Sequence, residues 1–244
     1  DLWLRYYQNM MQIDGGKNDM FVAWADSGAM PMGMWDGSST AMWKVAEKYT
    51  LADHFFMGGF GGSFFNHQWL ICACAPHYAD ADTSAAKPTI AVVDPDGVTL
   101  TVAENSPKSA MDGEPKFVGD GTLTPDFYAV NTMQPPYQPS ANAPAEGGDP
   151  RFSDPLKATT LPPQTEPTIG DLLSLKGVNW AWYGGAWQYV LDNGNNTPVP
   201  TFQYHHQPFN YYANYAPGTP ARAEHLRDGG LNGVNFLQVI DTGK

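Results

Sequence analysis

The amino-acid sequence predicts an α/β fold with a central, mostly parallel sheet flanked by helices. Apolar residues at helical spacing alternate along the chain with short apolar runs that are typical of buried strands. With 244 residues, of which 42% are hydrophobic, the chain is long enough to bury a sizeable core. Neither length nor composition requires a second domain, so we expect one domain over residues 1–244.

The first part of the chain is expected to be mainly helical. The spacing of its aromatic residues and methionines predicts a helix over 1–12 that ends at Gly15 and Gly16. Ser39 precedes another apolar stripe and is predicted to cap a helix that runs to about Tyr49. Three methionines lie between these helices, and we expect them to fill gaps in the core: Met30, Met32 and Met34.

Four glycines crowd against one serine in the stretch 58–63, and the serine opens a long apolar run. Ser63 is a preferred N-cap residue, so we expect a helix that starts there and stays buried on all sides to about Ala75. The unpaired N–H groups and the positive dipole end of such a helix suit a phosphate or another anion. Asn66 and His67 would share the face of Ser63. The local pattern leaves open that Ser63 only caps the helix.

Known glycine motifs do not account for this stretch. A nucleophile elbow requires a glycine two places after the serine, where this chain has Phe65, and a Walker loop requires a lysine that is absent here. The last glycine of the dinucleotide-binding pattern is replaced by Phe64. Any chemistry at Ser63 therefore belongs to another class.

Two cysteines, Cys72 and Cys74, lie two residues apart on the helix that is predicted to start at Ser63. Side chains two apart on a helix do not face each other. We therefore expect two small buried thiols that neither form a disulfide nor bind a metal, which leaves the redox compartment undecided.

The texture of the sequence changes after Pro76. Two β-rich runs on either side of a turn at 94–97 predict a β-hairpin over 89–102. From 122 to 167 prolines, glycines and small polar residues predominate, which predicts a long irregular excursion over the surface. Residues 77–167 are thus expected to form a hairpin and loop excursion within the single domain.

Helical and strand-like spacing returns in the last part of the chain. Thr168 and Asp171 are typical of a capping box for a helix to about Lys176, and the apolar run 178–183 after it predicts a buried strand. A Thr-Pro pair at 219–220 predicts the start of another helix.

Two adjacent histidines, His205 and His206, stand in an aromatic segment. In a strand they would face opposite sides, whereas in a loop both could reach one site. A histidine is more often a structural hydrogen-bonding group than a catalyst, so the pattern alone assigns neither of them a role.

The chain is acidic, with 13 basic and 25 acidic residues and a formal net charge of −12. This charge argues against nucleic acid and against an anionic membrane surface as partners. The longest apolar run is far shorter than a membrane span, and no charged-then-apolar leader precedes Asp1. The sequence thus shows neither a transmembrane segment nor a targeting signal.

Several segments together resemble one family of enzymes. The run Tyr-Thr-Leu-Ala-Asp-His-Phe-Phe at 49–56, which leads into Gly-Gly-Ser-Phe-Phe-Asn-His-Gln at 61–68, is similar to the acid phosphatase and bacterial phospholipase C family of phosphoesterases, within the alkaline phosphatase superfamily. The likeness covers most of the chain, because it extends to three further regions: 13–19, 168–183 and 204–209.

The resemblance implies a set of site residues. In that family the serine of the Gly-Gly-Ser segment is the nucleophile and a metal ligand, which corresponds to Ser63, and a His-His pair lines the phosphate pocket, which corresponds to His205 and His206. The resemblance therefore implies an alkaline-phosphatase-like sheet with Ser63 at the end of a strand. It also implies hydrolysis of phosphate monoesters or phospholipid headgroups through a phosphoserine intermediate, with a divalent metal ion, in the periplasm or outside the cell.

The sequence departs from the family pattern in two respects. Family members open with a Glu-Asn metal-ligand motif and carry an Asp-Asp pair after the His-His segment, and neither motif occurs between Asp1 and Lys244. Leu4 stands where relatives are expected to carry a histidine. The chain thus resembles an internal piece of a longer parent protein, with the other metal ligands outside it, and the isolated piece is expected to be inactive. The competing interpretation is a non-catalytic phosphate-binding or structural module in which Ser63 is only a cap.

Overall fold

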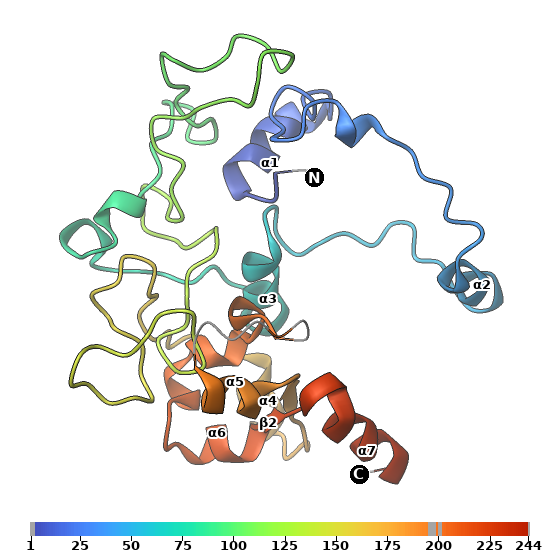
Figure 1. Cartoon of the computed structure of the whole chain (residues 1–244), viewed down its shortest axis with the longest axis vertical. Helices are drawn as coiled ribbons and strands as arrows, with labels where there is room; N and C mark the ends of the chain where they lie inside the picture. Colours follow the sequence, from blue (N-terminus) through green and yellow to red (C-terminus); the bar gives the residue numbers. More distant parts are fainter. Residues whose placement is uncertain (1–2, 195–198, 200–201, 244) are drawn as a thin grey trace.

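The computed structural model describes residues 3–194, 199 and 202–243 (Figure 1). Two strands pair in parallel, β1 (Trp182–Gly184) and β2 (Leu226–Asp228). The helices are α1 (Tyr6–Ile13), α2 (Ala41–Lys48), α3 (Ser63–Cys72), α4 (Ile169–Leu175), α5 (Trp187–Asn193), α6 (Pro220–His225) and α7 (Val234–Thr242). Short 3₁₀ turns lie between them. The fold is therefore of the α/β class.

The sheet is much narrower than the sequence predicts. Among the described residues, regular strands are confined to the pair β1 and β2, and other strand-like segments meet only in isolated bridges such as Val93 with Leu100. The prolines and glycines of residues 77–167 explain part of this difference, because proline lacks a ladder donor and glycine weakens a strand. The described residues therefore do not show the expected central sheet.

Helix α1 confirms the first expected helix from Tyr6 onward, whereas 3–5, which the prediction also placed in it, are not helical. It ends where Asp14 takes a left-handed conformation with φ 45°, just before the two glycines that were predicted to stop it. Asp1 and Leu2, where the predicted helix would start, lie outside the described residues. Tyr7 and Met11, one turn apart, face inward and join the core.

Helix α2 stands away from the rest of the molecule on two long extended segments (Figure 1). Its N-cap is Thr40, whose side chain accepts a hydrogen bond from the Trp43 N–H, so the prediction of Ser39 as the cap is off by one residue. The expectation that the preceding methionines fill the core is wrong. Met30, Met32 and Met34 are 74%, 72% and 97% exposed. The segment that carries them runs outward without packing.

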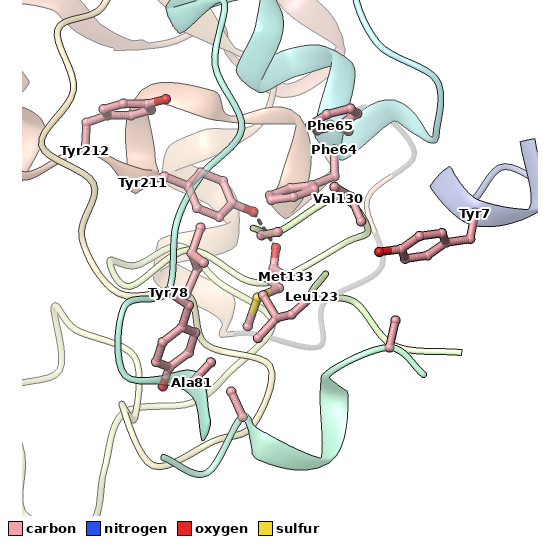
Figure 2. Packing of buried hydrophobic residues seen from close by; sticks show 14 of the residues in the cluster. Tyr7, Phe64, Phe65, Tyr78, Ala81, Leu123, Val130, Met133, Tyr211 and Tyr212 are labelled. Atoms are coloured by element: carbon pink, nitrogen blue, oxygen red, sulfur yellow. Dashed lines mark hydrogen bonds between the residues drawn. The ribbon is translucent and has the colours of Figure 1, made fainter. Parts of the chain in front are cut away.

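The main core joins α1 and α3 to the irregular middle of the chain (Figure 2). Phe64 of α3 packs edge-on against Tyr211, with ring centroids 5.5 Å apart. The Tyr211 hydroxyl is fully buried and donates a hydrogen bond to the Met133 carbonyl at 2.6 Å. A buried hydroxyl without such a partner would cost roughly 1–3 kcal/mol. This bond therefore helps to hold the segment 77–167 against the C-terminal part of the chain.

The excursion at 77–167 is more than a surface loop. Its predicted hairpin is present in reduced form, as one antiparallel bridge between Val93 and Leu100. Three of its apolar side chains are fully buried in the main core: Leu123, Met133 and Leu161. From α6, Arg222 donates hydrogen bonds to the carbonyls of Gln138 and Tyr215. The excursion is thus an integral part of the folded unit.

The cysteine prediction is wrong, because Cys72 and Cys74 form a disulfide. Helix α3 ends at Cys72, and Ala73 takes the left-handed conformation with φ 53°. This reversal turns Cys74 back toward Cys72 and brings their Cα atoms to 5.1 Å, within the range that a disulfide requires. The prediction failed because it assumed that the helix continues past Ala73. The helix is also not buried on all sides, since Leu70 is 65% exposed.

Two predicted helix starts in the last part of the chain are confirmed. Thr168 and Asp171 form a capping box, in which each side chain accepts a hydrogen bond from the other residue's backbone N–H. Thr219 accepts from the Arg222 N–H ahead of Pro220 in α6. Over the described residues, none of the helices is long and apolar enough to cross a membrane.

Candidate active site

Ser63 is the first residue of α3 and its side chain is exposed. The N-cap is Gly62, so the interpretation of Ser63 as the cap is wrong, and its hydroxyl makes no capping hydrogen bond. Phe64 and Phe65 follow and are only 1% and 5% exposed. Burial of these two rings anchors the first turn of the helix, while Ser63 itself stays exposed.

Asn66 holds the glycine loop in front of Ser63. Its side-chain oxygen accepts a hydrogen bond from the Gly59 N–H at 3.2 Å. Its amide nitrogen donates to the carbonyls of Gly59 at 3.0 Å and Gly62 at 3.2 Å. An extended loop that lacks regular backbone bonds is thus tied to the helix that it precedes.

Gly62 lies tightly against the N-terminal segment. A Cβ at this position would come within 2.7 Å of the Leu4 carbonyl oxygen, a backbone atom that cannot swing away. Leu4, which stands where relatives are expected to carry a histidine, therefore lies beside the loop that leads to Ser63. Its own side chain is 57% exposed.

Gly62→Ala is expected to lower the free energy of unfolding by roughly 1–3 kcal/mol, because the new methyl group forces the loop away from Leu4. Denaturant unfolding measures this loss. Gly37→Ala is the matched control, since its Cβ would meet only the Trp35 ring at 3.4 Å. Both changes reduce the entropy of the unfolded chain alike. Equal stability of the two variants would show that the close approach at Gly62 does not exist.

The two adjacent histidines lie in a 3₁₀ turn, Tyr204–His206, next to the start of α3. The His206 Nε2 atom is 2.8 Å from the Ser63 Oγ atom. The His205 ring meets the His206 ring nearly edge-on, with centroids 4.4 Å apart. The fold therefore brings together Ser63, His205 and His206, although Ser63 and His206 are 143 positions apart along the chain.

A third imidazole completes the cluster. His67, one turn after Ser63, stacks on His206 with ring centroids 4.5 Å apart and planes 7° from parallel. Burial lowers the pKa of His206, and the nearby His67 lowers it further. Burial, together with His206 and His67, lowers the pKa of His205 to about 4. His205 and His206 are therefore expected to be largely uncharged near neutral pH.

His205 should make the stability of the protein pH-dependent. Its pKa falls from 6.5 in the unfolded chain to about 4 in the folded one, so the unfolded state binds more protons between these values. The part of the free energy of unfolding that depends on a neutral His205 is fully present above pH 6.5 and is lost as the pH falls toward 4. Denaturant unfolding across this window should show that the free energy of unfolding of wild type rises with pH relative to that of His205→Gln. A constant difference would contradict the lowered pKa.

The described residues do not fit a metal ion. None of their His, Cys, Asp and Glu side chains form a group of three or more that could hold one. Asp53, the carboxylate nearest to Ser63 in the upstream sequence, pairs with His54 through Oδ1 and Nδ1 at 2.9 Å, and both side chains are strongly exposed. The expected role of Ser63 as a metal ligand therefore has no supporting ligand set among the described residues.

Sequence reasoning placed Asn66 and His67 on the face of Ser63 but gave neither a function. The signal was their spacing of three and four residues from the serine, which puts them one helical turn away. Two sizeable cavities, of about 560 and 450 Å³, lie elsewhere and are lined by none of the three predicted site residues.

At the start of α3 an exposed serine thus lies within hydrogen-bonding distance of an imidazole. A family model described as "Phosphoesterase family" matches residues 1–244, and the chain belongs to this family. The match bears out the resemblance to the acid phosphatase and phospholipase C type, and it places the chain among hydrolases of phosphate esters. A search of curated proteins found no match.

Proposed function

We propose that the parent protein, the gene product that carries these 244 residues, hydrolyses phosphate esters through Ser63 as nucleophile. The observation that carries this proposal is the 2.8 Å contact between Ser63 Oγ and His206 Nε2. A serine hydroxyl is a weak nucleophile until an adjacent base accepts its proton. A neutral His206 with its proton on Nδ1 presents the free Nε2 lone pair that this step requires.

The reaction takes two steps. Ser63 Oγ attacks phosphorus and passes its proton to His206 Nε2, while the bond from phosphorus to the ester oxygen breaks and the alcohol leaves with a proton from His206 or water. Water then attacks the phosphoserine, the bond from phosphorus to Ser63 Oγ breaks, and the serine recovers a proton. The product is inorganic phosphate, or a phosphorylated headgroup where the substrate is a phospholipid.

Binding of the phosphoryl group rests on two features near Ser63. The N-terminal turn of α3, ten residues long, supplies unpaired N–H groups and the positive end of the helix dipole. His205 can donate one N–H bond to a phosphate oxygen, and a bound dianion would favour its protonation. Both features stabilise negative charge where it develops during the transfer.

A divalent metal ion is the part of the family chemistry that the described residues do not support, since they lack a ligand group for it. Ser63 and the histidines are therefore the residues of this chain that take part in the proposed steps. In the parent protein the metal would be held by residues outside this chain, with Ser63 as one further ligand.

The disulfide supports a location in the periplasm or outside the cell. Disulfides form and persist in oxidising compartments and are rare in the cytosol. Cys72 and Cys74 are joined at the end of the helix that carries Ser63. With the net charge of −12, this favours a secreted phosphoesterase that acts on small phosphate esters or phospholipid headgroups and not on nucleic acid.

The phosphoserine intermediate gives the direct test. Rapid acid quench of the parent protein during turnover, followed by peptide mass spectrometry, should show one added phosphoryl group on the peptide that contains Ser63. The same treatment of the Ser63→Ala protein should show none. A phosphoryl group on a histidine, or turnover without any phosphorylated peptide, would contradict the proposed mechanism.

A further inference from the structure

His67 makes two contacts at once, both with the proposed catalytic pair. Its Nδ1 atom lies 2.7 Å from the backbone carbonyl oxygen of Ser63. A carbonyl oxygen only accepts hydrogen bonds, so Nδ1 carries a proton in either charge state of the ring. In the neutral ring the other nitrogen, Nε2, is then unprotonated. Through this bond the orientation of His67 is fixed by the backbone at the start of α3.

The face of the same ring lies against His206. Centroids 4.5 Å apart and planes only 7° from parallel describe full ring stacking. His206 is thereby held by Ser63 Oγ at Nε2, by His67 on one face and by the edge contact with His205. Rotation of the His206 ring would break the first two contacts together.

We infer that His67 is a positioning residue for His206: its stacked ring and its bond to the Ser63 carbonyl hold the His206 Nε2 atom on the Ser63 hydroxyl. The role rests on the proposed function of Ser63 and His206. It needs no contact between His67 and the substrate.

Steady-state kinetics of the parent protein test this role. His67→Ala should lower kcat by about 10-fold or more with little change in KM, because a misplaced base affects the chemical step more than binding. His67→Phe should restore part of kcat, because its flat ring can still lie against His206. The control is His77→Ala, since His77 also lies against an aromatic ring, that of Tyr128, with ring centroids 4.8 Å apart. That variant should leave kcat and KM unchanged, whereas an unchanged kcat in His67→Ala would overturn the inference.

Failure of this inference is distinguishable from failure of the proposed function. If the Ser63→Ala parent keeps full activity, the mechanism is wrong whatever the His67 variants do. If His67→Phe does not unfold cooperatively, His67→Gln replaces it, since a glutamine amide can still donate to the Ser63 carbonyl. His67→Gln should then keep a higher kcat than His67→Ala.

Discussion

Ser63→Ala is expected to lower turnover of a chromogenic phosphate ester by the parent protein by about 10³-fold or more. In the proposed mechanism the hydroxyl is the atom that attacks phosphorus, and alanine has no nucleophile to replace it. Phe64 and Phe65, which anchor the helix, are untouched by the change, so the variant should fold with wild-type stability. The measurement is kcat and KM under the same conditions for both proteins.

The chain offers a matched control for this substitution. Ser174 of α4 is also a helical serine bonded to a histidine, with its Oγ atom 3.2 Å from His225 Nε2. It accepts a further hydrogen bond from the Trp180 indole and follows no glycine loop. Ser174→Ala should therefore leave turnover almost unchanged. Full activity in Ser63→Ala, or equal losses in both variants, would sink the nucleophile assignment.

Local signals in the sequence predicted local structure well. The capping box of Thr168 with Asp171, and Thr219 ahead of Pro220, need only residues within one turn of each other to form. Such features are fixed by short-range hydrogen bonds, so the sequence around them is enough. Local spacing was not enough at Ala73. Its left-handed conformation brings Cys72 and Cys74 together in a disulfide, where two free thiols were expected.

The site depends on contacts that no local pattern carries. Ser63 and His206 are 143 positions apart, and the resemblance to a known family was the reason to expect them in one place. It did not say which of the two histidines meets the serine. Because the pair lies in a 3₁₀ turn and not in a strand, both rings can approach the site. His206 contacts the Ser63 hydroxyl, and His205 contacts the His206 ring. Their roles in catalysis stay a prediction.

The exposed arm around α2 shows the limit of composition as a guide. Methionines, tryptophans and phenylalanines usually signal a core, yet Met34 is 97% exposed and Phe55 is 86% exposed. Burial is decided by what an extended segment can pack against, and the described residues place nothing against this arm (Figure 1). Residue type alone could not predict that outcome.

The isolated 244-residue chain is expected to show no phosphoesterase turnover, with or without added divalent ions, although the parent protein is active. A hydroxyl needs strong activation to attack phosphorus, and in metal-assisted hydrolysis the ion supplies much of it. The described residues contain no group of three ligands that could hold such an ion. Hard cations require several oxygen ligands in one place, whereas the Asp53 carboxylate stands exposed and paired with His54.

Two measurements on the same samples test this expectation. Titration calorimetry of the chain with zinc, manganese and magnesium should show no tight site, while cooperative thermal unfolding confirms that the chain is folded. In the parent protein a chelator should abolish turnover, and the matching ion should restore it. Turnover by the chain alone would mean that Ser63 and His206 suffice without a metal. Tight metal binding by the chain would mean that ligands assemble among these residues in a way that their geometry here does not provide.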